Sequence, residues 1–352
     1  MEMYRLTPEN RVALLMHDVL GQYPGKIGHG LLRYGIAPTV VVIDRATAGQ
    51  NLRDLTGIDA DIPIVASIEE ALAFTPDVLI PAISPAGGML PAGWTEEIET
   101  ALEAGLSIAN GLHIALSRDA RFTRLLQRPG QFIWDVRQEP EGLTTGSGQA
   151  RLSAAKRVLF VGTDMNVGKM TAALEMDRQA RARGLRSKFL ATGQTGIMIA
   201  GEGVPLDAVK LDYAPGAIEK LILDNSGNQD YLFVEGQGSL FHPASTATLA
   251  LIRGAMPTHL ILVHRAYQRE IKGASWVRLP ALTEAIDLYE RVSLMRTSAE
   301  TIAPKVVGIA LNTGHLNASE AQQALDEAAQ QTALPVADVV RGGAQMLLNA
   351  VL

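Results

Sequence analysis

Short, continuously apolar runs alternate with helical patterns along almost the whole chain, and this alternation most constrains the fold. In the first third the apolar runs are Val12–Met16, Thr39–Ile43, Ile62–Val65, Asp77–Ile80 and Ser107–Ala109. Strands that are apolar on both faces and are separated by helices form parallel sheets with helices on both sides. The first third therefore predicts a doubly wound α/β domain of the Rossmann-like type.

The same alternation returns in the second half of the chain. Its apolar runs are Arg157–Val161, Lys188–Ala191, Tyr231–Glu235, His259–Val263 and Val306–Leu311. Residues 138–156 lie between the halves and are rich in Gly, Ser, Thr and charge without periodicity, which is typical of a linker. We therefore expect two doubly wound α/β domains with parallel sheets, spanning 1–137 and 157–352.

A glycine-bracketed loop joins the first strand of the second half to a helix. The segment RVLFVGTDMNVGKMT runs from Arg157 to Thr171 and ends in Gly-Lys directly before the helical pattern. In a phosphate-binding loop, backbone amides surround an anion, the helix N-terminus adds positive potential, and the lysine reaches terminal phosphate oxygens. The residues expected to bind phosphates are Gly162, Thr163, Asn166, Val167, Gly168, Lys169, Met170 and Thr171. This predicts a P-loop NTPase-like second domain.

The loop departs from the usual P-loop pattern in two ways. Five residues rather than four separate its two bracketing glycines, Gly162 and Gly168. Met170 stands where Ser or Thr would supply the magnesium hydroxyl, which weakens an assignment to ATP hydrolysis or phosphoryl transfer. A P-loop without that hydroxyl can still bind phosphates, such as those of coenzyme A.

Polar residues also follow other strands of the second half. Glu235 ends the run YLFVE and is followed by Gly236, so it could act as a base, hold a metal-bound water or grip a substrate ammonium. The remaining polar residues at strand ends are Thr192, Gln194, Thr195, Arg265 and Asn312. Because the carboxyl ends of parallel strands meet at one edge of a sheet, these side chains are expected to outline one ligand site.

The first domain has a glycine-rich loop of its own. Gly21, Gly25, Gly28 and Gly30 follow the first strand, and Asp44 ends the second. This is similar to a dinucleotide fingerprint, but the glycines do not fall into the G-x-G-x-x-G register. A turn that binds nothing or supports an interface is an equal alternative.

Composition excludes several classes of function. The chain has 31 Lys and Arg against 37 Asp and Glu and no basic block, so we expect no nucleic-acid or membrane partner. It has no cysteine, which excludes a disulfide framework, a thiolate metal site and a thiol nucleophile. No secretory leader or stretch of about 18 apolar residues is visible, which predicts a cytoplasmic protein. We expect no metal site.

Several segments also carry a family resemblance. GTDMNVGKMT and VEGQGSL resemble the phosphate loop and the later acidic strand of the dethiobiotin-synthetase-like P-loop class. Over nearly its full length the chain resembles the bacterial D-glutamate N-acetyltransferase family, through IDRATAGQNLRDLTGI, ANGLHIALS, VGTDMNVGKMT, SKFLATGQTGIM, VEGQGSLFHPAS and GIALNT. The resemblance implies a Rossmann-like domain followed by a P-loop domain. It also implies acetyl transfer from acetyl-CoA, as co-substrate, to the amino group of D-glutamate or a related amino acid.

This activity suggests roles for the candidate residues. The loop with Lys169 and Asn312 would bind coenzyme phosphates, and Glu235 or Asp164 would act as the base. Backbone amides of residues 192–196 would stabilise the oxyanion, with Thr192, Gln194 and Thr195 as substrate-binding residues. Arg265 or Arg45 would hold substrate carboxylates. Because the chain lacks cysteine, the simplest course is direct transfer within a ternary complex.

Two other classes of function remain open. The first is an ATP- and magnesium-dependent ligase or kinase of the dethiobiotin-synthetase-like class, in which Thr171 or Asp164 would have to restore magnesium binding. The second is a nucleotide-binding regulator without turnover. In each case the partner is a small molecule, and a symmetric homo-oligomer is the expected assembly.

Overall fold

The computed structural model describes residues 5–83, 90–296 and 301–352. The chain forms two compact units, and each is made of two separate stretches. The first unit comprises Met1–Glu139 with Gln194–Ala208, and the second comprises Pro140–Gly193 with Val209–Leu352. Residues 194–208, expected in the second domain, therefore belong to the first unit. The expected linker, from Pro140 onward, belongs to the second.

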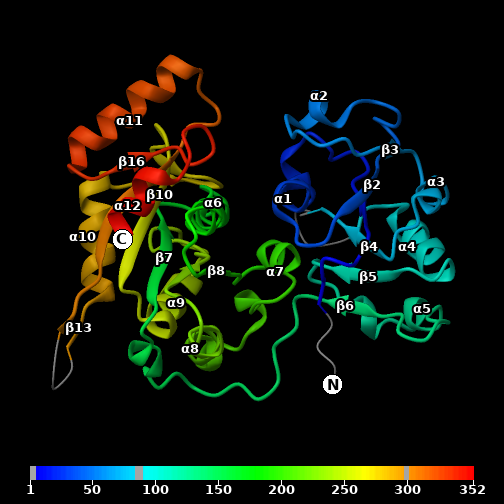
Figure 1. Ribbon diagram of the computed structural model, residues 1–352, viewed down its shortest axis with the longest axis horizontal. Coiled ribbons are helices and arrows are strands. Elements are labelled where there is room, and N and C mark those ends of the chain that lie inside the picture. The colour runs from blue at the N-terminus through cyan, green and yellow to red at the C-terminus, as the bar shows by residue number, and fades with distance from the viewer. Residues whose placement is uncertain (1–4, 84–89, 297–300) are drawn as a thin grey trace. The chain divides into compact units, whose positions relative to one another are not determined.

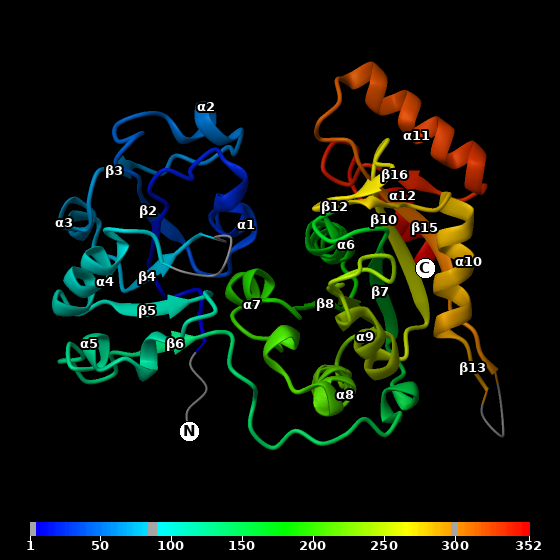
Figure 2. The same ribbon diagram turned by 180° about the vertical axis from the view of Figure 1, so that it is seen from behind.

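The first unit contains a parallel sheet in the order β3-β2-β1-β4-β5-β6, the strand order of a Rossmann fold. Its strands are β1 (Val12–Leu15), β2 (Thr39–Ile43), β3 (Ile64–Val65), β4 (Val78–Pro81), β5 (Ser107–Asn110) and β6 (Ile133–Asp135). Its helices are α1 (Lys26–Tyr34), α2 (Leu52–Thr56), α3 (Ile68–Ala71), α4 (Trp94–Glu103), α5 (Ala120–Thr123) and α7 (Gln194–Ala200). In both views α1 lies on one side of strands β2 and β4 and α3 on the other (Figures 1 and 2). The Rossmann-like expectation is confirmed.

Helix α7 joins the first unit through apolar and backbone contacts. Ile197 and Met198 are buried, and the carbonyl of Ile199 accepts a hydrogen bond of 2.9 Å from the amide of Ile36, after α1. A side chain at Gly201 would come within 2.2 Å of the Leu6 carbonyl, so the backbones meet closely there. These contacts fix the turn that the sequence places after the strand 188–191.

The second unit contains a parallel sheet in the order β16-β15-β10-β7-β9-β8. Its strands are β7 (Lys156–Gly162), β8 (Ser187–Leu190), β9 (Tyr231–Val234), β10 (His259–Arg265), β15 (Lys305–Asn312) and β16 (Val336–Ala337). Two hairpins accompany them: β11 (Glu270–Ile271) with β12 (Ala274–Arg278), and β13 (Met295–Arg296) with β14 (Thr301–Ile302). The helices are α6 (Lys169–Ala182), α8 (Ala214–Asn225), α9 (Ala247–Ala255), α10 (Leu282–Ser293), α11 (Ala318–Thr332) and α12 (Gln345–Val351). The P-loop-type α/β fold is confirmed.

The segment before β7 is held on the second unit by one carboxylate. Glu219 of α8 is buried and accepts hydrogen bonds from the amides of Ser147 and Gln149 at 3.0 and 2.7 Å. The Ser147 hydroxyl donates a further bond of 2.7 Å. Gly216 allows this approach, because a Cβ there would lie 1.8 Å from the Thr144 carbonyl. These residues therefore lead into β7 along a fixed path.

Candidate functional site

The loop between β7 and α6 has the backbone shape that phosphate binding requires. Asn166 and Gly168 have positive φ angles of 55° and 112°, and Lys169 is the first residue of α6. Left-handed residues in a turn that leads into a helix N-terminus direct backbone amides toward one point. Met170 and Thr171 follow in the first turn of α6, where both are half-buried. The predicted loop residues are thus contiguous at the carboxyl end of β7.

Asp164 links this loop to the β11–β12 hairpin and the residues before it through hydrogen bonds. One carboxylate oxygen accepts bonds from Gln268 Nε2 at 2.6 Å and from the Lys272 amide at 2.8 Å. The other accepts from the Met165 amide at 2.6 Å. The side chain is buried, with both oxygens in use. This geometry favours a structural role for Asp164 and leaves Glu235 as the better candidate for the base.

The base of the loop rests on buried side chains from three other elements. The Thr163 hydroxyl lies 2.8 Å from Nδ1 of His264, whose pKa burial lowers to about 4. The Ser239 hydroxyl donates to the Thr163 carbonyl at 2.9 Å. From α10, the hydroxyl of Tyr289 donates to the Gly162 carbonyl at 2.6 Å and accepts from the Leu240 amide at 3.2 Å. The loop is therefore pre-formed.

Lys169 and Glu235 are a buried pair of opposite charge beyond the carboxyl ends of β7 and β9. Lys169 is 6% and Glu235 4% exposed, and each shifts the pKa of the other toward its charged form. Burial outweighs that attraction: it lowers the pKa of Lys169 to about 8 and raises the pKa of Glu235 to about 7. Lys169 Nζ donates to the Asp164 carbonyl at 2.8 Å. Both groups therefore change charge near neutral pH.

The turn after β8 uses its amides within the protein. The amides of Thr192 and Gly193 donate to one Glu235 oxygen at 2.8 and 3.1 Å, and the Thr192 hydroxyl donates to the Glu235 carbonyl at 2.8 Å. Since an amide that holds a carboxylate cannot also bind an oxyanion, these two do not fit the oxyanion role proposed from sequence. They instead fix the position of Glu235.

The other predicted residues are distributed over both units. Asn312 supports the loop, because its side-chain amide donates to the Val167 carbonyl at 3.1 Å. Arg265 lies opposite Asn312 at the end of β10, is exposed, and makes no side-chain ion pair or hydrogen bond with the described residues. Gln194 and Thr195 begin α7 and so belong to the first unit, as does Arg45.

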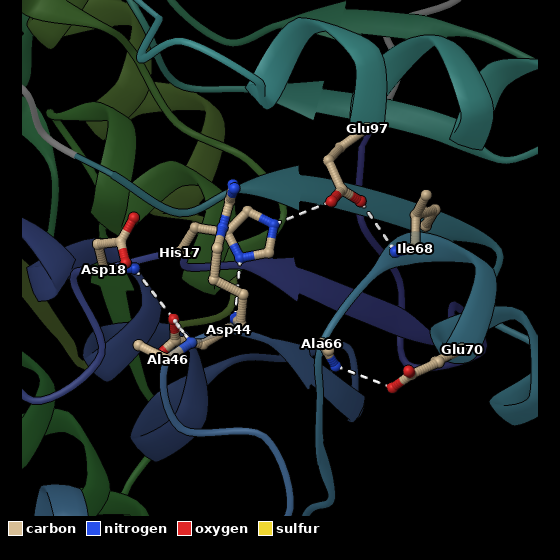
Figure 3. Close-up of polar contacts among 9 residues, drawn as sticks. His17, Asp18, Asp44, Ala46, Ala66, Ile68, Glu70 and Glu97 are labelled. Atoms are coloured by element: carbon tan, nitrogen blue, oxygen red, sulfur yellow. Dashed lines mark hydrogen bonds and ion pairs between the residues drawn. The ribbon is translucent and has the colours of Figure 1, made fainter.

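In the first unit, a hydrogen-bonded cluster holds the strand ends (Figure 3). The Arg45 amide donates to His17 Nδ1 at 3.1 Å, so His17 Nε2 carries the hydrogen that faces Glu97 at 3.0 Å. Glu97 also accepts from the Ile68 amide at 2.8 Å. Asp44 is buried and accepts from the Asp18 amide at 3.0 Å and the Thr47 hydroxyl at 2.6 Å. The Asp44 carboxylate is thus occupied by its own chain, which does not favour the dinucleotide fingerprint considered from the sequence.

The glycines of the first unit have packing roles. A Cβ at Gly28 would lie 2.3 Å from the Met16 sulfur, and one at Gly25 would lie 2.4 Å from the Val19 carbonyl. These positions allow α1 to pack closely on β1 and its following loop. This favours the alternative in which the glycine-rich segment is a structural turn.

Comparison with known proteins decides the family. A P-loop domain described as a domain of unknown function, DUF1611_C, matches residues 144–348, and the Rossmann-like domain DUF1611_N matches 45–139. The chain belongs to the DUF1611 family. This chain is 51% identical in sequence to a DUF1611 family protein from Anabaena variabilis whose crystal structure is known. The two structures superpose with a TM-score of 0.93, and the match covers 97% of this chain and 99% of that one.

Two curated relatives of this DUF1611 protein have named activities. It is 39% identical over 285 residues to a D-glutamate N-acetyltransferase from Tritonibacter scottomollicae, covering 81% of this chain and 84% of the relative. It is 30% identical over 283 residues to a second one from a Pseudoalteromonas species, covering 80% and 83%. These relationships assign this DUF1611 member to the N-acetyltransferase enzymes.

Two further observations concern the described residues. Among them, no group of three or more His, Cys, Asp or Glu side chains is arranged to hold a metal ion. Nor does that part of the chain include a helix with the length and apolar character needed to cross a bilayer.

The site includes partners that the sequence analysis does not identify, namely the buried Ser239, His264 and Tyr289 and the half-buried Gln268. Only His264 has a local signal, since it lies in a strand end already singled out by Arg265. The others come from loops and helices whose sequences fit ordinary solvent-facing or core positions.

Replacing Gly236 with alanine is expected to destabilise this DUF1611 protein. A Cβ at Gly236 would lie 1.6 Å from the Phe160 carbonyl, and neither backbone can rotate away as a side chain would. Overpacking of this kind costs about 1–3 kcal/mol. Thermal denaturation should show a clearly lower midpoint for Gly236→Ala, whereas Gly227→Ala, where a Cβ meets no atom within 4 Å, should leave it unchanged. Equal midpoints for both variants would contradict the packing described here.

Proposed function

We propose that this protein transfers the acetyl group of acetyl-CoA to the amino group of D-glutamate, or of a related amino acid, and that the P-loop binds the coenzyme phosphates. The observation that carries the proposal is its 39% identity, over 81% of the chain, to a protein named for this reaction. The pre-formed loop with a buried lysine at the start of α6 supports the second part.

The reaction needs few groups. The amine nitrogen attacks the thioester carbonyl, a C–N bond forms, the C–S bond breaks, and coenzyme A leaves as the thiol after taking up a proton. A base must collect the proton that the amine loses. Glu235 suits this role, since burial raises its pKa to about 7 and so makes its carboxylate basic enough to accept a proton near neutral pH.

Lys169 is suited to bind the coenzyme phosphates. Its ammonium is desolvated, and within the described residues it donates a hydrogen bond to a neutral carbonyl, that of Asp164. An anionic phosphate would be a stronger partner than a carbonyl, because charge-assisted hydrogen bonds are about twice as strong as neutral ones. Met170 supplies no hydroxyl for magnesium, and acetyl transfer from a thioester requires none.

The carboxylates of the acceptor need cationic partners. Arg265 fits, because it is exposed at the carboxyl end of β10 and holds no carboxylate among the described residues. Arg45 is the corresponding candidate in the first unit, where its amide donates to His17, which in turn contacts Glu97. A guanidinium can bind a carboxylate through two parallel hydrogen bonds.

The direct test is an assay of thiol release from acetyl-CoA in the presence of D-glutamate. The chain has no cysteine, so a thiol reagent detects only the coenzyme product. We expect thiol release that depends on both substrates, and product N-acetylation visible by mass spectrometry. Parallel assays with L-glutamate and D-aspartate measure the specificity for the acceptor.

A thermal-shift series separates the proposal from the two alternatives. Stabilisation by acetyl-CoA without magnesium supports acetyl transfer. Stabilisation by ATP only with magnesium, together with no thiol release, would overturn it in favour of the ligase or kinase class. Nucleotide binding without turnover of either kind would instead indicate a regulator.

A further inference from the structure

The β11–β12 hairpin lies directly beside the phosphate loop. Asp164, in the loop, accepts hydrogen bonds from Gln268 just before β11 and from Lys272 in the hairpin turn. In Figure 2, β12 is seen next to α6, the helix that begins at Lys169. Ile271 and Ala274, on either side of the turn, are buried. The hairpin is therefore anchored at its turn, close to where phosphates would bind.

The hairpin carries an exposed tryptophan in an irregular part of its ladder. Ile271 pairs with Ala274 and Glu270 with Arg278, so β11 advances by one residue while β12 advances by four. Ser275, Trp276 and Val277 therefore form a bulge, a feature that redirects side chains and often lies near active sites. Trp276 is 79% exposed, more than any other large apolar side chain in the described residues.

The hairpin is also locally cationic in an acidic chain. Arg269, Lys272 and Arg278 carry positive charge against two carboxylates, that of Glu270, 3.9 Å from the Arg278 guanidinium, and that of Asp164 in the loop, whereas the whole chain has a formal charge of -6. Arg269 is exposed and its side chain makes no hydrogen bond or ion pair with the described residues. An aromatic ring beside cations is complementary to a ligand that combines a flat base with phosphates.

We propose that this hairpin binds the nucleotide end of the coenzyme, with Trp276 stacked on the adenine ring and the hairpin cations facing the 3′-phosphate. The inference rests on the proposed function, since it takes the P-loop to hold the diphosphate of the same molecule. Coenzyme A has both parts that the hairpin complements: a purine and a phosphate beyond the diphosphate. Trp276 is then a residue that selects the coenzyme over shorter thioesters.

The test compares two acetyl donors, acetyl-CoA and S-acetyl-pantetheine, which lacks the nucleotide. Trp276→Ala should raise the KM for acetyl-CoA at least about fivefold and leave the KM for S-acetyl-pantetheine unchanged. Trp276→Phe, which keeps an aromatic face, should recover most of the loss. Met346→Ala, at another exposed apolar side chain of the second unit, is the matched control and should change neither KM.

A binding measurement adds a readout independent of turnover. Trp94 is buried and Trp134 half-buried, so acrylamide quenching of tryptophan fluorescence reports mainly on Trp276. Adenosine 3′,5′-bisphosphate should protect the wild-type protein from quenching, less so at high salt. It should give no protection in Trp276→Ala.

Each other outcome has a distinct meaning. If the wild-type protein binds acetyl-CoA but Trp276→Ala affects both donors equally or neither, the hairpin proposal is wrong and the proposed function stands. If Trp276→Ala lowers the mass measured by sedimentation and leaves both KM values unchanged, the ring is an interface between copies, and the proposal is again wrong. If acetyl-CoA does not bind the wild-type protein, the proposed function itself fails.

Discussion

Replacing Lys169 with alanine will weaken binding of coenzyme A by about 100-fold, because each charge-assisted hydrogen bond to a phosphate contributes about 1.5–3 kcal/mol. The fold should tolerate the change. Burial of the lysine has an electrostatic cost, which lowers its pKa to about 8, and within the described residues its ammonium donates a hydrogen bond to a backbone carbonyl. Lys169→Met, which retains the apolar stem, should lose the same affinity. Isothermal titration calorimetry with coenzyme A measures both.

Lys220→Ala is the matched control for this experiment. Lys220 is exposed on α8 and pairs with Asp224 one helical turn away at 2.8 Å, so its removal takes away a surface charge and nothing from the loop. Its affinity for coenzyme A should equal that of the wild-type protein. An unchanged affinity in Lys169→Ala as well would exclude the loop as the phosphate site.

Replacing Glu235 with glutamine should lower kcat by about 10²–10⁴, the range that general base catalysis contributes. Glutamine keeps an oxygen that can accept from the amides of Thr192 and Gly193, so the turn after β8 should keep its shape. The affinity for coenzyme A should change little, which separates loss of the base from loss of the phosphate site. Stopped assays of thiol release with saturating D-glutamate give kcat. A kcat within threefold of wild type would exclude Glu235 as the base.

The pH dependence of the wild-type enzyme follows from the same two groups. Glu235 must be deprotonated to accept a proton, so kcat/KM for acetyl-CoA should fall as pH drops through about 7. Lys169 must be protonated to hold phosphate, so the same quantity should fall as pH rises through about 8. The expected profile is a narrow bell. In Glu235→Gln the acidic limb should disappear, while the basic limb should remain but move to lower pH, because the Glu235 carboxylate raises the pKa of Lys169. An acidic limb that persists in this variant would belong to another group.

Folding stability should depend on pH with a sign that distinguishes Glu235 from an ordinary surface acid. Its folded-state pKa, about 7, lies above the ordinary glutamate value of 4.5, so between these values the folded protein binds more protons than the unfolded chain. Glu235 therefore favours folding less as pH rises through that window. This is the opposite of a salt-bridged carboxylate, and it is the behaviour expected of Glu235 if it is the proposed base.

The sheets could be predicted from the sequence because each central strand is buried on both faces. Such a strand is continuously apolar through its middle, and residues 40–43 of β2 and 260–263 of β10 show this locally. The edge strands β6 and β16 are short and leave no comparable run. Helix α11 spans Ala318–Thr332 and begins after Asn317, whose side chain accepts a hydrogen bond from the Glu320 amide.

The candidate site could be predicted only in part, for a similar reason. The phosphate loop is contiguous, so its glycines and lysine are visible together in the sequence. Its supports are not: the hydroxyl of Tyr289 and the Gly162 carbonyl are 127 positions apart, and Gln268 and Asp164 are 104 apart. Nor can residue types tell whether a backbone amide is already used, which is why the turn at Thr192 suggested oxyanion donors that in fact hold Glu235.

Because α7 packs in the first unit, the polypeptide cannot be divided into two independent fragments by a single cut. A cut in the serine- and glycine-rich stretch near residue 140 looks natural, yet the C-terminal piece would carry residues 194–208 without the surface that covers them. Ile197, Met198 and Ile199 would then be exposed together on one short helix, an aggregation hazard for that fragment. The N-terminal piece would lack the partner of Ile36. Neither unit is therefore formed by one continuous stretch of the chain. The phosphate loop is best studied in the intact polypeptide.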